Sequence, residues 1–153
     1  MNGYLKRAGM TLIAMLALGL AEKTWAAEAD SKNPVGPDKV VYHISDTEAQ
    51  ASRAMQYINN HLEVNPKAKI VVVTHAFGVD FLMEGAKNKT GNPYNIPVEE
   101  LEGRGVRFLV CEITLRERKL ARKQFIPEAT YVPSGVAEIT RLQQREGYAY
   151  LRP

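Results

Sequence analysis

An apolar run at residues 69–77, KIVVVTHAF, is the feature that most restricts the fold of this chain. Apart from its first residue it carries no charge, and it does not alternate between polar and apolar positions. Such a run is typical of a strand that is covered on both faces of a parallel sheet. It therefore indicates an α/β fold rather than a helical bundle or a one-sided antiparallel sheet.

Further strand patterns lie on both sides of this run. Residues 39–44, 106–111 and 129–134 are rich in β-branched and aromatic side chains, and residues 147–153 contain a possible last strand. Helix patterns separate them. Ser45 and Glu48 have capping-box spacing before an apolar face formed by Ala51, Ala54, Met55, Ile58 and Leu62.

Shorter helices are expected at residues 77–84, 98–105 and 114–124. Thr114 and Glu117 would form the capping box of the last of these. Ser134 would cap a further helix, in which Val136, Ile139 and Leu142 share one face. The alternation of strands and helices predicts one α/β domain over residues 39–153, with a mainly parallel sheet.

The N-terminus has the pattern of a secretory signal peptide at residues 1–26. Lys6 and Arg7 precede a twelve-residue apolar stretch that is shorter than the roughly 20 residues needed to span a bilayer. Cleavage after Ala26 is expected, with Ala29 as a second site and an uncleaved anchor as the alternative. The mature protein would be periplasmic, without a stable membrane span, and residues 27–38 would be a flexible lead-in.

The net charge does not point to nucleic acid. The formal charge of the whole chain is +3, but three basic residues and one acidic residue belong to the predicted leader. The mature chain is therefore close to neutral, and no nucleic-acid partner is expected.

Cys111 is the single cysteine, so an internal disulfide is impossible. It ends the 106–111 strand and precedes a helix with several basic residues. The helix N-terminus and these cations would favour the thiolate, which is the nucleophilic form. A free cysteine also packs well as a small apolar residue, so the alternative is an inert core position.

Two histidines also end predicted strands, namely His43 on the first and His75 on the second. Ligands of parallel sheets collect at the carboxyl ends of the strands, so both are candidate site residues beside Cys111. His75 could act as a base toward the thiol, and His43 could bind a ligand. The alternatives are hydrogen-bonded structural histidines, or a copper or zinc site made of both histidines and Cys111.

The basic run at residues 116–123, with Arg116 as its first candidate, could bind or steer small anions such as sulfur oxyanions. The alternative is an ordinary solvated helix face. No cofactor is expected, because Gly103 and Gly105 precede a strand, whereas a dinucleotide-binding glycine motif follows one.

Two stretches together, GVRFLVCEITL and YVPSGVAEITRLQQREGYAYLRP, resemble the DsrE/DsrF-like family, which includes YchN-like proteins. The resemblance covers Lys39–Pro153. It implies a three-layer α/β/α domain with a five-stranded, mainly parallel sheet, and a homotrimer or homohexamer. In sulfur-relay members a cysteine at this strand end carries sulfane sulfur as a persulfide, a role that would fall to Cys111.

Two features depart from the relay members: the predicted export, and the charged stretch EITLRERK after the cysteine. Three hypotheses follow. The first is a periplasmic sulfur carrier that exchanges sulfur with a donor or acceptor protein. The second is an oligomeric small-ligand-binding module with a structural cysteine. The third is a metal-binding protein.

Overall fold

The computed structural model describes residues 37–153. The predicted signal peptide, and the predicted lead-in up to residue 36, lie outside the described residues. Within residues 37–153 no helix is both long enough and apolar enough to cross a membrane.

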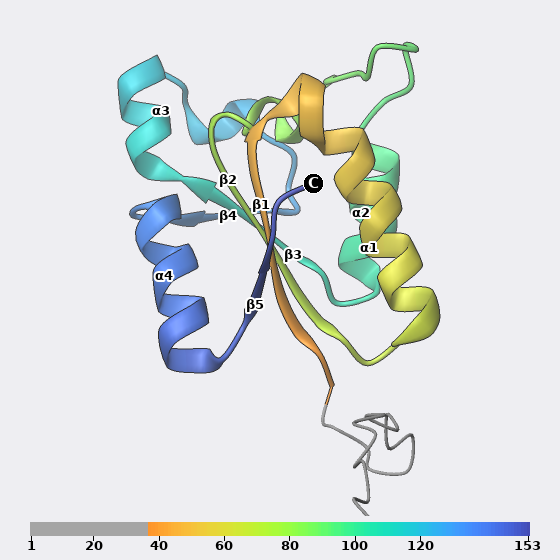
Figure 1. Cartoon of the computed structure of the whole chain (residues 1–153). Coiled ribbons are helices and arrows are strands. Elements are labelled where there is room, and N and C mark those ends of the chain that lie inside the picture. Colours follow the sequence, from red (N-terminus) through yellow and green to blue (C-terminus); the bar gives the residue numbers. More distant parts are fainter. Residues whose placement is uncertain (1–36) are drawn as a thin grey trace, which may run out of the picture. The chain divides into compact units, whose positions relative to one another are not determined.

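A five-stranded sheet with the order β4-β3-β2-β1-β5 forms the centre of the fold, and every adjacent pair of strands is parallel. Helices α1 and α2 cover one face of the sheet and α4 covers the other, so the architecture is the expected α/β/α sandwich (Figure 1). We call these the α1 face and the α4 face. The strands are β1 (Lys39–Asp46), β2 (Lys69–Phe77), β3 (Arg107–Cys111), β4 (Ala129–Val132) and β5 (Ala149–Leu151). The α-helices are α1 (Ser52–Val64), α2 (Asn95–Gly103), α3 (Glu112–Arg118) and α4 (Gly135–Glu146), with short helical turns η1 (Thr47–Ala51), η2 (Asp80–Leu82) and η3 (Arg122–Gln124).

The α1 face holds the larger apolar core. Alternate strand residues, such as Ile44, Val72 and Val110, pack there against Ile58 of α1 and Leu101 of α2, and all five are completely buried. Strand β2 is buried on both faces over most of its length, as its continuous apolar sequence predicts.

The α4 face holds a much smaller core. Val41, Val71, Val73 and Leu109 pack there against Ile139 and Leu142 of α4, together with Tyr148. The prediction that Val136 belongs to the apolar face of this helix is wrong, because its side chain is 59% exposed. Val136 lies in the first turn of α4, beyond the apolar strand residues that bury Ile139 and Leu142.

The helix after β3 also differs from the prediction. It starts at Glu112, directly after Cys111, and ends at Arg118, because Lys119 adopts a left-handed backbone with φ of 54°. Thr114 is not its cap: it is buried inside the helix, and its hydroxyl oxygen accepts from the backbone N–H of Ala76. A separate turn, η3, follows.

Three other helices start at residues that differ from the prediction. Asp46 rather than Ser45 caps the first helical segment, whose first turn is π-helical, and α2 begins at Asn95. The helix expected at residues 77–84 is only the turn η2. Ser134 does cap α4, with its hydroxyl accepting from the backbone N–H of Ala137.

Candidate functional site

The strand register places His43, His75 and Cys111 on the same face of the sheet. Each follows the α4-face residues of its strand at a spacing of two, after Val41, Val73 and Leu109 respectively. Their neighbours Ile44, Thr74 and Val110 point to the α1 face. The three chemically active side chains therefore meet beyond the last apolar layer beneath α4.

His43 is hydrogen-bonded at both ring nitrogens. Its Nε2 lies 2.6 Å from Nε2 of His75, and its Nδ1 lies 2.6 Å from the hydroxyl oxygen of Tyr150. The two imidazole rings stack, with centroids 4.7 Å apart. Tyr150 comes from β5, which pairs with β1 at the sheet edge. One chain of contacts thus links β5, β1 and β2.

Both histidines are held in the neutral form at neutral pH. Burial, then the neighbouring His75 and Arg152, lower the pKa of His43 to about 4. Burial and the charge of Arg152 also lower the pKa of His75. A neutral imidazole has one N–H and one lone pair, so His75 retains a nitrogen that can accept a proton.

Cys111 lies at the N-cap of α3 and is 4% exposed. Burial acts to raise the pKa of its thiol. Hydrogen bonds from the backbone N–H groups of Gly135, Thr114 and Ile113, and from the Thr114 hydroxyl, act to lower it, and the pKa falls on balance. Polar N–H and O–H groups close to a sulfur atom favour its charged form over the neutral thiol.

Gly135 brings the start of α4 against this sulfur. A β-carbon at Gly135 would lie 3.3 Å from Cβ of Cys111, 3.3 Å from the carbonyl oxygen of Thr74 and 3.4 Å from Cβ of His75. Cys111 and His75 therefore extend from the sheet beside the same glycine. A larger side chain there would push the helix away from the thiol.

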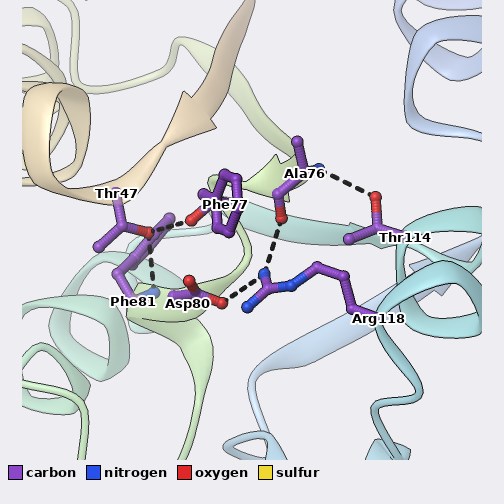
Figure 2. A network of polar contacts seen from close by, with 7 residues as sticks. All are labelled: Thr47, Ala76, Phe77, Asp80, Phe81, Thr114 and Arg118. Carbon is purple, nitrogen blue, oxygen red and sulfur yellow. Dashed lines mark hydrogen bonds and ion pairs between the residues drawn. The ribbon is translucent and has the colours of Figure 1, made fainter.

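The turn after His75 has an unusual backbone. Ala76 adopts φ of 50°, a left-handed conformation that is uncommon for alanine. Its N–H donates to the Thr114 hydroxyl oxygen over 2.9 Å, and its carbonyl accepts from Arg118 over 2.9 Å (Figure 2). Arg118 also pairs with Asp80 over 2.6 Å. Because Thr114 lies in the first turn of α3, which begins directly after Cys111, this network links the β2 turn to the helix start at the thiol.

Two further contacts hold the same turn. The Thr47 hydroxyl donates to the carbonyl of Phe77 over 2.8 Å and accepts from the N–H of Phe81 over 3.1 Å (Figure 2). Gly78 passes so close to β1 that a β-carbon would lie 2.2 Å from the carbonyl oxygen of Ile44. The carboxyl ends of β1 and β2 are thus firmly connected.

The C-terminal residues are tied to the same edge of the sheet. The buried Gln50 donates to the carbonyl of Pro153 over 3.1 Å, and its side-chain oxygen accepts from the N–H groups of Ser45 and Asp46. Arg152 donates to the Ser45 hydroxyl over 3.1 Å. These contacts hold Tyr150 and Arg152 near the histidine pair.

Arg116 does not join this group in the structure. It is exposed on α3 and lines a hollow of about 530 Å³ with Lys119 and Arg122, which does not include the histidines or Cys111. Two other cations of the run have local partners, since Arg118 pairs with Asp80 and Arg122 with Glu112. The pKa of the thiol is lowered by nearby N–H and O–H groups and not by the basic run.

Tyr150, Arg152, Thr114 and Gly135 were not foreseen as site residues. One signal was present in the sequence YAY at residues 148–150: side chains two apart on a strand share a face, and Tyr148 packs in the α4-face core. The metal hypothesis gains no support, since residues 37–153 contain no group of three or more His, Cys, Asp or Glu side chains placed to hold a metal ion.

Comparison with known proteins agrees with this architecture. The model of the DsrE/DsrF-like family matches residues 38–153. The chain belongs to the DsrE/DsrF-like family. Among solved structures, the protein of unknown function MTH1491 from Methanobacterium thermoautotrophicum is 32% identical; the match covers 76% of this chain and 99% of that chain, with a TM-score of 0.67.

The ychN protein from E. coli is similar in fold, with 13% identity, the same coverage of 76% and 99%, and a TM-score of 0.64. A search among curated proteins found no match. The expected family and its α/β/α fold are therefore confirmed for this DsrE/DsrF-like chain.

Proposed function

We propose that this protein is an exported sulfur-handling member of its family, in which Cys111 accepts sulfane sulfur and passes it on. The observation that carries the proposal is the position of Cys111 at the N-cap of α3, where the start of α4 at Gly135 packs against it and the pKa of its thiol is lowered. This position favours a thiolate, and His75 lies beside the same glycine as a candidate base.

The proposed step needs no oxidant or reductant. The Cys111 thiol gives its proton to His75, and the thiolate attacks the outer sulfur of a donor persulfide, R–S–SH. A new S–S bond forms on Cys111, the S–S bond of the donor breaks, and the donor leaves as a thiolate that takes the proton back from His75. Cys111 then holds a persulfide for an acceptor thiol.

A homotrimer or homohexamer in the periplasm, with a separate donor or acceptor protein, is part of this proposal. Apolar side chains that stay uncovered support self-association. Val64 and Leu151 line one groove of about 450 Å³ between α1 and the sheet edge, and Val64 is 87% exposed. The charge pattern of the leader is what supports export.

Sulfur loading tests the proposal. The mature protein is incubated with a low-molecular-weight persulfide and its intact mass is measured, with Cys111→Ser as the control. We expect a gain of one sulfur that a reductant removes and that the serine variant lacks. A wild-type protein that gains no sulfur, while its thiol reacts with a small alkylating reagent, would rule out the carrier function.

One observation favours a second candidate, a small-ligand-binding module with a structural cysteine: the thiol is only 4% exposed. A hollow of about 370 Å³ between Asp46, Phe77, Asp80 and Tyr94 would then be the more accessible binding place. Under this alternative the thiol stays unmodified in the folded protein, and Cys111→Ala leaves ligand binding unchanged.

A further inference from the structure

A buried thiol must exchange its proton with solvent if it is to react. One polar chain starts at the partly buried His75, which packs beside Cys111 against Gly135, and runs through His43 to Tyr150. Tyr150 is 39% exposed, whereas Cys111 is 4% exposed. The chain therefore has one end at the edge strand β5 and its other end beside the thiol.

We propose that Tyr150, His43 and His75 form a proton relay that controls the protonation of the Cys111 thiol. Residues 150–153 are part of this relay. This inference rests on the proposed function for its biological purpose, but the relay itself is defined by the two 2.6 Å contacts of His43. Tyr150 and His43 are positioning residues here, and only His75 packs beside Cys111, against the same Gly135.

The geometry couples the tautomers of the two histidines. A 2.6 Å contact between two Nε2 atoms requires one N–H and one lone pair, so the rings never carry the Nε2 proton at the same time. If Tyr150 donates to Nδ1 of His43, then His43 donates from Nε2, and His75 carries its proton on Nδ1. If His43 donates from Nδ1 to Tyr150, then His75 donates from Nε2 and its Nδ1 is a free base.

Passage between these two arrangements moves one proton over the whole relay. Starting from the first, Nδ1 of His75 releases its proton toward the sulfur, Nε2 of His43 gives its proton to His75, and the Tyr150 hydroxyl gives its proton to His43. The Tyr150 oxygen then takes a proton from water. The reverse sequence carries the thiol proton out to solvent. Nδ1 adjoins the Cβ end of the ring, which is the end that lies against Gly135.

The charged and titratable groups around the relay suit neutral histidines. Arg152 acts on both rings from the C-terminal segment, and its contact with Ser45, together with that of Gln50 with Pro153, holds the segment in place. A positive charge at this position opposes the doubly protonated pair, which has no lone pair to pass a proton on. The segment thus supplies both the end of the relay and the charge that keeps it functional.

Tyr150→Phe tests the relay, with Tyr57→Phe as a matched control, because Tyr57 is 45% exposed and lies on α1. The nitrogen chemical shifts of both imidazoles, measured by NMR, report the tautomers, and iodoacetamide gives the Cys111 alkylation rate against pH. In Tyr150→Phe we expect both histidines to change tautomer population together. The alkylation rate of Cys111 at neutral pH should change by about fivefold. This is a smaller effect than the loss of the general base itself would cause.

Tyr57→Phe should alter neither readout, and His43→Gln should reproduce the alkylation change of Tyr150→Phe. If Tyr150→Phe stays folded and leaves the His75 shifts or the alkylation profile as in the wild type, the relay is wrong. Its failure is distinct from that of the carrier function, because alkylation and NMR need no sulfur donor. A wild-type protein that takes up no sulfur but shows the tautomer coupling would retain the relay and lose the carrier.

Discussion

The two faces of the sheet differ in how their strands end. On the α1 face, the core continues to the carboxyl ends of the strands, where the apolar Ile44 and Val110 and the hydrogen-bonded Thr74 are fully buried. On the α4 face, the apolar layer stops earlier and is followed by His43, His75 and Cys111. The same three strands therefore provide a closed core on one side and a reactive edge on the other.

Stability and chemistry are therefore separated by the alternation of side chains along the strands and not by the order of the elements. The larger core can stabilise the fold. The smaller core stops before the carboxyl ends of the strands and leaves room there for polar side chains. Changes on the α1 face should therefore affect stability alone, and changes on the α4 face should affect stability and the thiol together.

The largest effects are expected from a matched pair of core leucines, Leu101→Ala on the α1 face and Leu142→Ala on the α4 face, both fully buried. Each should lower the free energy of unfolding by about 3 kcal/mol, because each leaves a cavity. Only Leu142→Ala should also change the alkylation rate of Cys111, since it loosens α4. Urea unfolding and alkylation kinetics check the pair, and equal alkylation rates in the two variants would contradict the separation.

A smaller effect is expected on acidification. The pKa of His43 is about 4 in the folded protein against 6.5 ordinarily, so the unfolded chain binds a proton first as the pH falls. Stability should be unaffected by this group above pH 6.5 and should decrease between pH 6.5 and 4. Since His43 is only partly buried, we expect a loss on the order of 1 kcal/mol. His75 acts in the same direction.

Urea unfolding over this pH window measures the decrease, with His43→Gln as the control that removes the titrating group. The variant should show a flatter profile than the wild type. Identical slopes in both proteins would mean that the histidine pair is not kept neutral by the fold.

The smallest effects are expected from two arginines on α3, Arg118 and Arg116. Arg118→Ala loses the contacts with the Ala76 carbonyl and Asp80, and should cost about 1 kcal/mol of stability because both are hydrogen bonds to a charged group. It should also shift the pKa of Cys111, through Thr114. Arg116→Ala removes an exposed side chain and should change stability by less than about 0.5 kcal/mol, with no effect on the thiol. If Arg116→Ala shifted the pKa of Cys111 as much as Arg118→Ala does, the basic run would be the source of thiol activation.

The sequence was sufficient to predict the strands, the family and the strand-end position of the three candidate residues. It could not predict that all three share a face, because a shift of one residue in register reverses every side chain. Tyr150 joins His43 across 107 residues of sequence through the pairing of β5 with β1, which no local pattern reveals. Arg118 was not separated from Arg116 because α3 starts two residues before the predicted Thr114.

Activation of the thiol is tested most directly by the pKa of Cys111 in the folded protein, measured from the ultraviolet absorbance of the thiolate against pH. Since Cys111 is the single cysteine, the Cys111→Ser spectrum provides the complete background. We predict a midpoint below the value of about 8.5 for a free thiol. A midpoint at or above that value would show that burial outweighs the nearby donors, and would make Cys111 an ordinary core residue.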